Sequence, residues 1–463
     1  MFFLGVEMMK KILGSIITLF FLAIPLFASY NSIGIPDSSE IRMDLEEKWF
    51  TAPLSAVRQN VPEIRNNDNG DRFQIRLEEN ETTFNVFVSP QAKVNVTVYS
   101  DTGYYIEKQI VYPGDAAGSW VLIRDKKTGK PIRIRYYFLK NSEVYVQFTP
   151  SGKIALADLV MFGNYAARGV PTGMPFEKFY TASFEDVMII TQNKLPWNYV
   201  LVDPELYHSI KQMIAVIREK LPLIQMVPDA MYNENNELVH ISTGKPLELQ
   251  QNNTKSEKKL SLSSAGFVKW IADGLVEPLS GGMIKREPLI TETVTVKDVG
   301  HLGILSQRYN LFFSLDWIRN LASAVISVYA GKNYLFNQSG VDVTVNPFAS
   351  SITDSGVSNV VTFIENTGYT VSVLNSLMYV LTATEPGTFY FGAIRGTDRT
   401  VSPEVKAFND CVAFFPYFMD DGAFACTVFM NGREMTLEDF CLLYSEDFVY
   451  LTRVKSSEQF FPY

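Results

Sequence analysis

The sequence predicts a protein of more than one domain, with an N-terminal all-β module of sandwich or barrel type and a C-terminal α+β domain. Residues 73–162 alternate apolar and polar side chains with a period of two, which is typical of half-buried strands. From about Asn198 onward, apolar residues recur at spacings of three and four, as they do in amphipathic helices. The chain has 463 residues, more than one hydrophobic core usually organises.

The first residues have the pattern of a secretory signal peptide. Lys10 and Lys11 precede an uncharged run over residues 12–27, and Ala28 offers a small residue for cleavage. The run is shorter than the roughly 20 residues that a helix needs to span a bilayer. We therefore expect residues 1–28 to be removed and the mature protein to be exported, either periplasmic or secreted. An uncleaved N-terminal anchor is the alternative.

The β-rich module is expected over residues 29–195. Its predicted strands cover residues 72–77, 83–88, 93–98, 120–123, 131–138 and 143–148, with a polar turn at 126–130. No catalytic pattern stands out in this segment, so a binding or spacer role is the interpretation that we favour for it.

The C-terminal domain is expected over residues 196–463. Asp203 followed by Pro204 is typical of a helix start, and the apolar spacing continues to Leu221. A second helix is predicted over 315–330, with Ser314 as N-cap and Gly331 as C-cap. Further predicted elements are a strand at 238–241, a helix at 371–381, a strand at 389–394 and a hairpin of 412–419 with 423–430.

Composition and charge exclude several classes of function. The formal net charge of −9 gives an acidic surface, which repels nucleic acid and anionic lipid. After the signal peptide no apolar run is long enough to span a membrane, so no stable membrane insertion is expected. Neither metal-ligand spacing nor a glycine-rich phosphate loop occurs, so we expect no metal and no cofactor.

The three cysteines, Cys411, Cys426 and Cys441, are expected to be buried or half-buried thiols without a disulfide. A two-residue turn at Asp421-Gly422 would place residue 417 opposite Cys426. Cys411 would then lie about six residues along the strand from that position, which is beyond disulfide reach.

One segment resembles a known family. Residues 263–270, Ser-Ser-Ala-Gly-Phe-Val-Lys-Trp, are similar to the nucleophile segment of the NlpC/P60 branch of papain-like cysteine peptidases, where a cysteine begins a helix. A helix N-terminus stabilises a thiolate, and the small residues that follow let a substrate backbone approach. In this chain Ser264 occupies the nucleophile position. The resemblance implies a papain-like fold and a substrate groove formed by Ser264, Ala265, Gly266 and Trp270.

Two downstream segments extend the resemblance. Residues 386–391 are similar to the Pro-Gly-Asp strand of the family, and residues 411–415 to the strand that begins with the catalytic histidine. The resemblance therefore places Cys411 at the position of the base and the third, orienting residue near Ala425 or Cys426. With these replacements it implies a catalytically inactive domain that binds peptides or cell-wall fragments. The implied partners are peptidoglycan stem peptides or an envelope protein.

Two other functions remain open. His301 begins a His-Leu-Gly-Ile segment similar to the His-Val-Gly-Ile strand of the family, and a Ser264–His301 pair would give an active serine-type cell-wall amidase or peptidase. The chain would otherwise be a structural envelope protein, with the groove filled by aromatic side chains. His208 and His240 are interpreted as helix-surface and strand residues. Asp316 and Arg319 are expected to form a local ion pair on one helix face.

Overall fold

The computed structural model describes residues 34–100, 103–140, 143–249, 259–294, 311–348, 350–353, 356–360, 363–399 and 404–463. They form two compact units. The first consists of the described residues up to Phe138 together with 148–155 and 172–192, and the second of 139–147, 156–171 and the remainder from Asn193. The division passes through strands β8 (Val144–Ser151) and β9 (Ile154–Met161). His301 and the signal-peptide segment lie outside the described residues.

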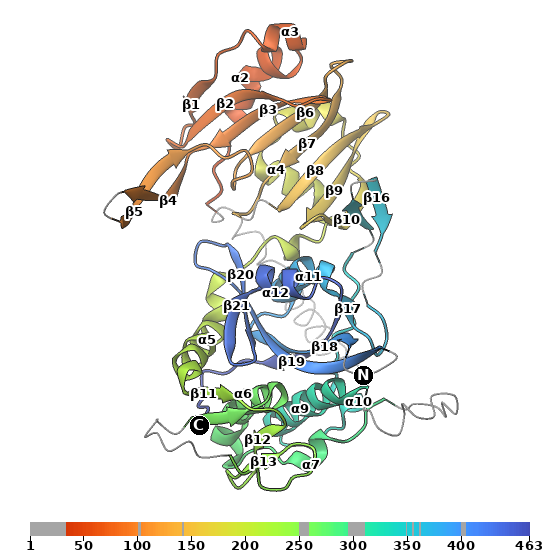
Figure 1. The fold of residues 1–463 in the computed structure, drawn as a ribbon. Coiled ribbons are helices and arrows are strands. Elements are labelled where there is room, and N and C mark those ends of the chain that lie inside the picture. Colours follow the sequence, from red (N-terminus) through yellow and green to blue (C-terminus); the bar gives the residue numbers. More distant parts are fainter. Residues whose placement is uncertain are drawn as a thin grey trace, which may run out of the picture. The chain divides into compact units, whose positions relative to one another are not determined.

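The first unit is built on antiparallel strands that hydrogen-bond in the order β1, β2, β3, β6 and β7 (Figure 1). Their bounds are β1 (Glu63–Asn66), β2 (Arg72–Glu79), β3 (Thr83–Pro90), β6 (Trp120–Asp125) and β7 (Pro131–Tyr136). Each strand that was predicted in this region is present. In β2 and β3, period-two alternation places one set of side chains in the core. Phe73, Ile75, Phe84 and Val86 belong to that buried set.

Helices cover the buried face of this sheet, where the period-two pattern had predicted a sandwich or barrel. They are α2 (Ser39–Leu45), η2 (Glu46–Phe50), α3 (Leu54–Val57), η3 (Phe176–Tyr180) and α4 (Phe184–Thr191). Aromatic pairs join the two layers: the ring centroids of Phe50 and Trp120 are 4.7 Å apart, and those of Tyr136 and Phe184 are 5.2 Å apart. Strands β4 (Ala92–Ser100) and β5 (Gly103–Val111) form a separate two-stranded sheet.

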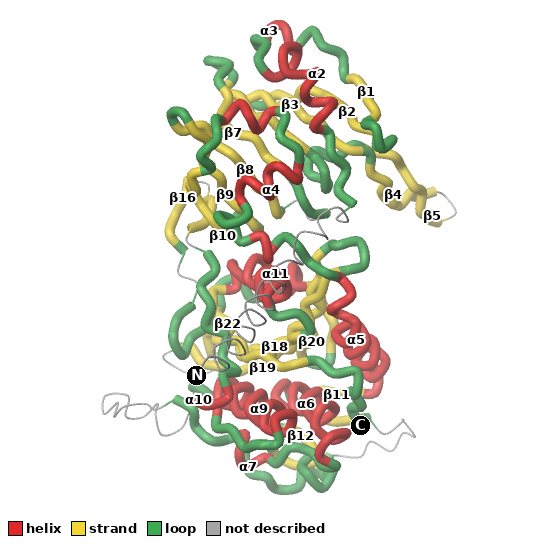
Figure 2. The backbone as a smooth tube through the Cα atoms, turned by 180° about the vertical axis from the view of Figure 1, so that it is seen from behind, coloured by secondary structure: helices red, strands yellow, loops and turns green. Residues whose placement is uncertain are grey.

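The second unit contains a six-stranded antiparallel sheet with helices on both faces (Figures 1 and 2). Its order is β17 (Tyr369–Thr370), β22 (Phe448–Lys455), β18 (Thr388–Asp398), β19 (Val405–Phe418), β20 (Phe424–Met430) and β21 (Arg433–Thr436). Helices α6 (Ser264–Ser280) and α9 (Phe313–Ala330) pack side by side on one face. Helices α11 (Leu374–Thr384) and α12 (Leu437–Leu443) cover the other face.

Shorter elements complete the second unit. They are β10 (Asn164–Pro171), η4 (Trp197–Tyr199), η5 (Pro204–Tyr207), α5 (His208–Lys220), η6 (Leu221–Leu223), β11 (Ile224–Met226), β12 (Ala230–Tyr232), β13 (Leu238–His240), β14 (Leu260–Leu262), α7 (Arg286–Leu289), α10 (Phe336–Ser339), β15 (Ser350–Thr353), β16 (Gly356–Asn359) and η7 (Val371–Val373). Strand β10 pairs with β15, and β11 pairs with β14 in parallel.

Several predicted helix ends need correction. The helix predicted after Asp203 is present, but its first turn is the 3-10 helix η5, in which the Asp203 carboxylate accepts a hydrogen bond from the Glu205 amide. Gly331 ends α9 in the left-handed conformation, as predicted, with φ +60°. Ser314 is not the N-cap of this helix, because α9 begins one residue earlier, at Phe313. Ser314 is instead buried inside the first turn.

The predicted hairpin between β19 and β20 is present with its register shifted by one residue. Phe418 pairs with Phe424, and Cys426 faces Pro416 rather than Tyr417. The loop holds three residues, Asp420 to Gly422, because the Met419 amide donates to the Ala423 carbonyl. Gly422 supplies the left-handed conformation with φ +80°, as is usual in three-residue hairpin loops.

At the level of fold class, the protein is mostly β-sheet, with several sheets, some helices and more than one compact unit. Within the part of the chain that the structure describes, no helix is long and apolar enough to cross a membrane.

Candidate functional site

The strongest candidate site lies where α6 begins, at the segment that the sequence had singled out. Ser263 is the N-cap: its hydroxyl accepts a hydrogen bond from the Gly266 amide at 3.1 Å, so Ser264 is the first helical residue. Twelve side chains or glycine positions of α6 are buried, so this helix is central to the unit. Its N-terminus carries the positive end of the helix dipole.

Gly266 is required because the protein's own backbone passes close to it, whereas the resemblance implied the approach of a substrate backbone. A Cβ atom at this position would lie 2.2 Å from the carbonyl oxygen of Ala230. That oxygen also accepts hydrogen bonds from the amide of Ser263 at 2.9 Å and from its hydroxyl at 3.1 Å. The close approach that glycine permits is therefore made by the chain's own strand β12 and not by a substrate backbone.

Asp410 of β19 is the residue that meets Ser264. Both side chains line one cavity; burial raises the pKa of the Asp410 carboxyl, and the interaction with the Ser264 hydroxyl lowers it by a smaller amount. The position expected for the base was Cys411. The one-residue difference coincides with a bulge in β19, where Asp410 pairs with Ile394 but the next pair is Phe408 with Arg395. A bulge inserts an extra residue and redirects the side chains beside it.

A cavity of about 540 Å³ opens in front of Ser264. Its polar lining includes Ser263, Asp229, Asn409, Asp410 and Asn431. Asn431 follows β20 in a two-residue Asn-Gly turn, in which Asn431 and Gly432 have φ +50° and +64°. Such a turn needs two residues that tolerate positive φ, as asparagine and glycine do. The turn alone therefore accounts for the asparagine at this position, without a functional role. Further lining residues are Met226, Val227, Pro228, Ile241, Ala265 and Phe313.

Asp229 connects the cavity to the hairpin of β12 and β13. Its carboxylate accepts hydrogen bonds from the amide and hydroxyl of Ser242 at 2.7 and 2.6 Å, and it lies 3.0 Å from His240 Nδ1. His240 therefore belongs to a strand, as interpreted, and its ring faces a carboxylate. His208 begins α5 with an exposed side chain.

None of the three cysteines is among the described residues that line the cavity. Cys411 is fully buried beside Ser314, and burial raises the pKa of its thiol to about 12. Cys426 lies in the middle of β20 opposite Pro416, where burial raises its thiol pKa well above the ordinary value. Burial raises the pKa of the half-buried Cys441 to about 11. All three thiols are free, and their raised pKa values make them poor nucleophiles at neutral pH.

Two other expected features are placed differently by the structure. Trp270 does not line the cavity: it is fully buried, its ring centroid is 5.7 Å from that of Phe267, and its indole N–H donates to the Tyr463 carbonyl. Asp316 and Arg319 are not a direct ion pair. Asp316 accepts hydrogen bonds from Thr293, and Arg319 pairs with Asp342 at 3.2 Å.

Of the expected groove residues, Ser264 and Ala265 line the cavity, while Gly266 and Trp270 do not. Sequence reasoning missed Asp229, Asn409, Asp410 and Asn431. Asp410 was adjacent to the expected base, but only the bulge decides which neighbour reaches Ser264. Asn431 had a visible signal, the Asn-Gly turn that ends β20, which could have placed it at the same end of the sheet.

In this arrangement the neighbour of the Ser264 hydroxyl is a carboxyl group. A serine hydroxyl is a weak nucleophile without a base to take its proton, and a carboxylate is a far weaker base than an imidazole. Among the described residues, two carboxylates and no lysine, arginine or histidine line the cavity. The cavity therefore suits a ligand with an ammonium group. The described residues contain no cluster of three or more histidine, cysteine or acidic side chains that could hold a metal ion.

Comparison with known proteins gives one family. Residues 31–199 match a family described as a domain of unknown function, DUF8515. The matched range covers the elements from α2 to η4 and excludes the Ser264 cavity. No curated protein and no solved structure shows significant similarity to the chain.

Proposed function

We propose that the chain is an exported protein whose second unit contains a papain-like domain of the NlpC/P60 type that has lost its catalytic residues and binds peptides of the cell wall. The observation that supports this most is the contact between Ser264 at the start of a helix and Asp410 on an adjacent strand. In the family that the sequence resembles, a cysteine and a histidine would hold these two positions.

The position of Asn431 is consistent with the same proposal. In the family the third polar residue comes from the strand after the one that carries the base. Asn431 directly follows β20, which pairs with β19, and it lines the same cavity as Ser264 and Asp410. The proposed equivalents of the catalytic residues are therefore Ser264, Asp410 and Asn431, in place of the Cys411 and Cys426 positions inferred from sequence.

The proposed ligand is a stem peptide with a free side-chain amine. Asp410 and Asp229 give the cavity negative charge, and an ammonium group is the natural partner of two carboxylates. Stem peptides carry such a group on their diamino acid. The acidic cavity distinguishes this ligand from an anionic wall polymer, which the same carboxylates would repel.

Asp410→Asn should weaken binding of a lysine-containing stem tetrapeptide roughly tenfold or more, because hydrogen bonds to charged groups contribute about 1.5–3 kcal/mol. Isothermal titration calorimetry on the mature chain measures this, with the Nε-acetylated tetrapeptide as a ligand that should bind equally weakly to both proteins. Asp420→Asn is the matched control, since Asp420 lies on the exposed hairpin turn of the same sheet.

Two results would contradict this function. One is unchanged tetrapeptide affinity in Asp410→Asn. The other is release of muropeptides from purified peptidoglycan by the wild type and not by Ser264→Ala, which would show an active serine enzyme and direct attention to His301.

The proposed relationship to papain-like peptidases can be tested by restoring a cysteine at position 264 and a histidine at position 410. In Ser264→Cys the carboxylate of Asp410 should keep the new thiol protonated and slow to alkylate. Adding Asp410→His should stabilise the thiolate and raise the alkylation rate of Cys at 264 at pH 7 by tenfold or more. Mass spectrometry of the iodoacetamide-labelled peptide separates this thiol from the three native ones. Equal rates in the single and double variants would argue against a papain-like arrangement.

A further inference from the structure

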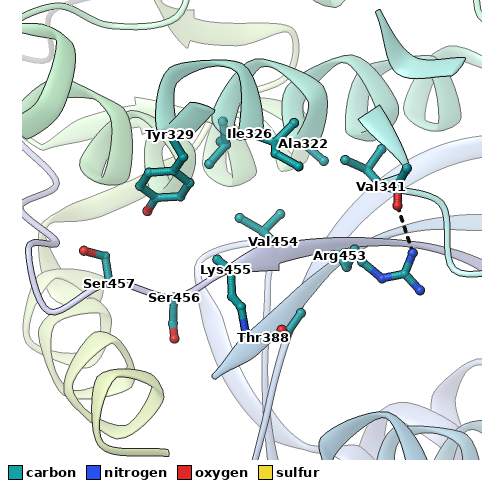
Figure 3. Close-up of a pocket in the computed structure, with 12 residues that line it drawn as sticks. Ala322, Ile326, Tyr329, Val341, Thr388, Arg453, Val454, Lys455, Ser456 and Ser457 are labelled. Carbon is teal, nitrogen blue, oxygen red and sulfur yellow. Dashed lines mark hydrogen bonds between the residues drawn. The ribbon is translucent and has the colours of Figure 1, made fainter. Parts of the chain in front are cut away.

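A second cavity, of about 420 Å³, lies between α9 and the last residues of β22 within the second unit (Figure 3). This volume is in the range of about 300–1,000 Å³ that is usual for small-molecule sites. The cavity shares no lining residue with the one at Ser264. It is therefore a separate candidate site, independent of the proposed function.

Apolar side chains form the walls of this cavity. Ala322, Ile326 and Tyr329 project from one face of α9, and Val454 of β22 faces them from below (Figure 3). Ile326 and Tyr329 keep 36% and 37% of their surface exposed. Burying this apolar surface under hydrocarbon would be favourable, at about 25 cal/mol per Å².

The two cations beside the cavity both donate hydrogen bonds to groups outside it, and Arg453 is also paired with a carboxylate. Arg453 forms a bidentate pair with Glu385 at 3.0 and 3.1 Å, and it also donates to backbone carbonyls. The Lys455 ammonium donates to the Pro386 carbonyl at 2.8 Å. No aspartate or glutamate is among the lining residues that the structure describes. The cavity thus favours an uncharged ligand.

Hydroxyl groups mark one end of the cavity. The Tyr329 hydroxyl points toward Ser457 there, and both side chains line the cavity (Figure 3). Burial raises the pKa of Tyr329 to about 12, so its hydroxyl remains a neutral donor at physiological pH. An uncharged ligand with a hydroxyl or ether oxygen at one end can exchange hydrogen bonds with this pair.

We propose that this cavity binds a neutral amphiphile with a single hydrocarbon chain. The chain lies between α9 and Val454, and its polar end meets Tyr329 and Ser457. A fatty acid anion does not fit the same site, because its carboxylate would lose water while the Arg453 guanidinium is paired with Glu385 and the Lys455 side chain points away from α9 (Figure 3).

Calorimetric titration of the mature protein with linear 1-alkanols tests the proposal. Affinity should rise about fourfold with each added methylene, the transfer value for a buried CH₂, and level off once the chain fills the cavity. The alkanoate of the same length should bind at least tenfold more weakly. Absence of alkanol binding, or tighter binding of the alkanoate, would overturn the proposal.

Variants locate the bound probe. Ile326→Trp fills the cavity and should weaken 1-alkanol binding at least tenfold, whereas Leu442→Trp, on the exposed side of α12, should leave it unchanged. Tyr329→Phe keeps the wall and removes the hydroxyl, so it should weaken binding roughly fivefold. Circular dichroism shows that each variant is folded. Equal affinity in Ile326→Trp and Leu442→Trp would place the alkanol elsewhere and refute this site.

Discussion

Arg42→Met is expected to destabilise the first unit by roughly 3–5 kcal/mol, the usual result of removing the buried cation from a charged hydrogen-bond network. Arg42 is 0% exposed. Its guanidinium donates to the Ser38 hydroxyl, the Tyr136 hydroxyl and the backbone carbonyls of Tyr180 and Ala182, at distances of 2.9 to 3.2 Å. It also pairs with Asp37 at 3.2 Å.

This network joins three segments that are distant in sequence. Asp37 additionally accepts a hydrogen bond from the Phe184 amide, and the Tyr136 hydroxyl donates to the Phe179 carbonyl at 2.7 Å. Methionine would fill the space but leave the Ser38 hydroxyl and the Tyr180 carbonyl without the donor that Arg42 gives them, and each buried polar group left without a partner costs about 1–3 kcal/mol. Arg42→Lys should recover only part of the loss, because a single ammonium cannot reach acceptors on several sides as the planar guanidinium does.

Hydrogen exchange measured by mass spectrometry on peptides from residues 120–136 and 176–186 checks this prediction. It reports on the first unit alone, whereas a single global unfolding curve of a two-unit chain does not. Arg58→Met is the control: Arg58 forms an exposed pair with Glu79, and exposed pairs contribute little to stability. Equal protection in both variants would show that the Arg42 network does not hold the unit together.

The elements that the sequence predicted correctly are those whose pattern is local. Strands β2, β3 and β6 follow from period-two alternation, and the left-handed Gly331 follows from helix-end chemistry. The helical layer over the first sheet was missed because its segments, such as η3 and α4, are too short to show a helical period. Its anchor, Arg42, has no signature in sequence, since burial of a charge depends on partners far along the chain.

The candidate site was predicted in part for a similar reason. The N-cap serine and the glycine after it locate the start of α6 from sequence alone. The residue opposite Ser264 depends on the bulge in β19, and the hairpin register depends on a three-residue loop rather than a two-residue one. Each shifts a strand by one residue, which exchanges its two faces, and neither can be read from an alternating pattern.

Asp273→Asn is the second large effect that we expect, again roughly 3–5 kcal/mol, now in the second unit. Lys269 and Asp273 are one turn apart on α6, and their side chains are 1% and 0% exposed. The Lys269 ammonium lies 2.6 Å from one oxygen of Asp273, and the other oxygen accepts a hydrogen bond from the Ile284 amide. Burial raises the pKa of Asp273, opposed by the charge of Lys269.

The asparagine variant isolates the charge. Its side-chain oxygen can still accept the Ile284 hydrogen bond, so the loss comes from leaving the Lys269 ammonium buried without a counter-charge. Lys269→Met combined with Asp273→Asn removes both charges and should return stability to within about 1 kcal/mol of the wild type, because apolar replacements of buried pairs are often neutral. Exchange protection of α6 peptides in the two single variants and the double variant completes the cycle.

The cycle also bears on the Ser264 cavity, since the same helix carries Ser264 at its start. A ligand that binds only the folded unit adds stability in proportion to the logarithm of its concentration over its dissociation constant. The tetrapeptide should therefore partly restore exchange protection in Asp273→Asn, whereas its Nε-acetylated form should not.

If the double variant is as unstable as Asp273→Asn, the uncompensated charge is not the cause, and the specific geometry around Asp273 must hold α6 in place.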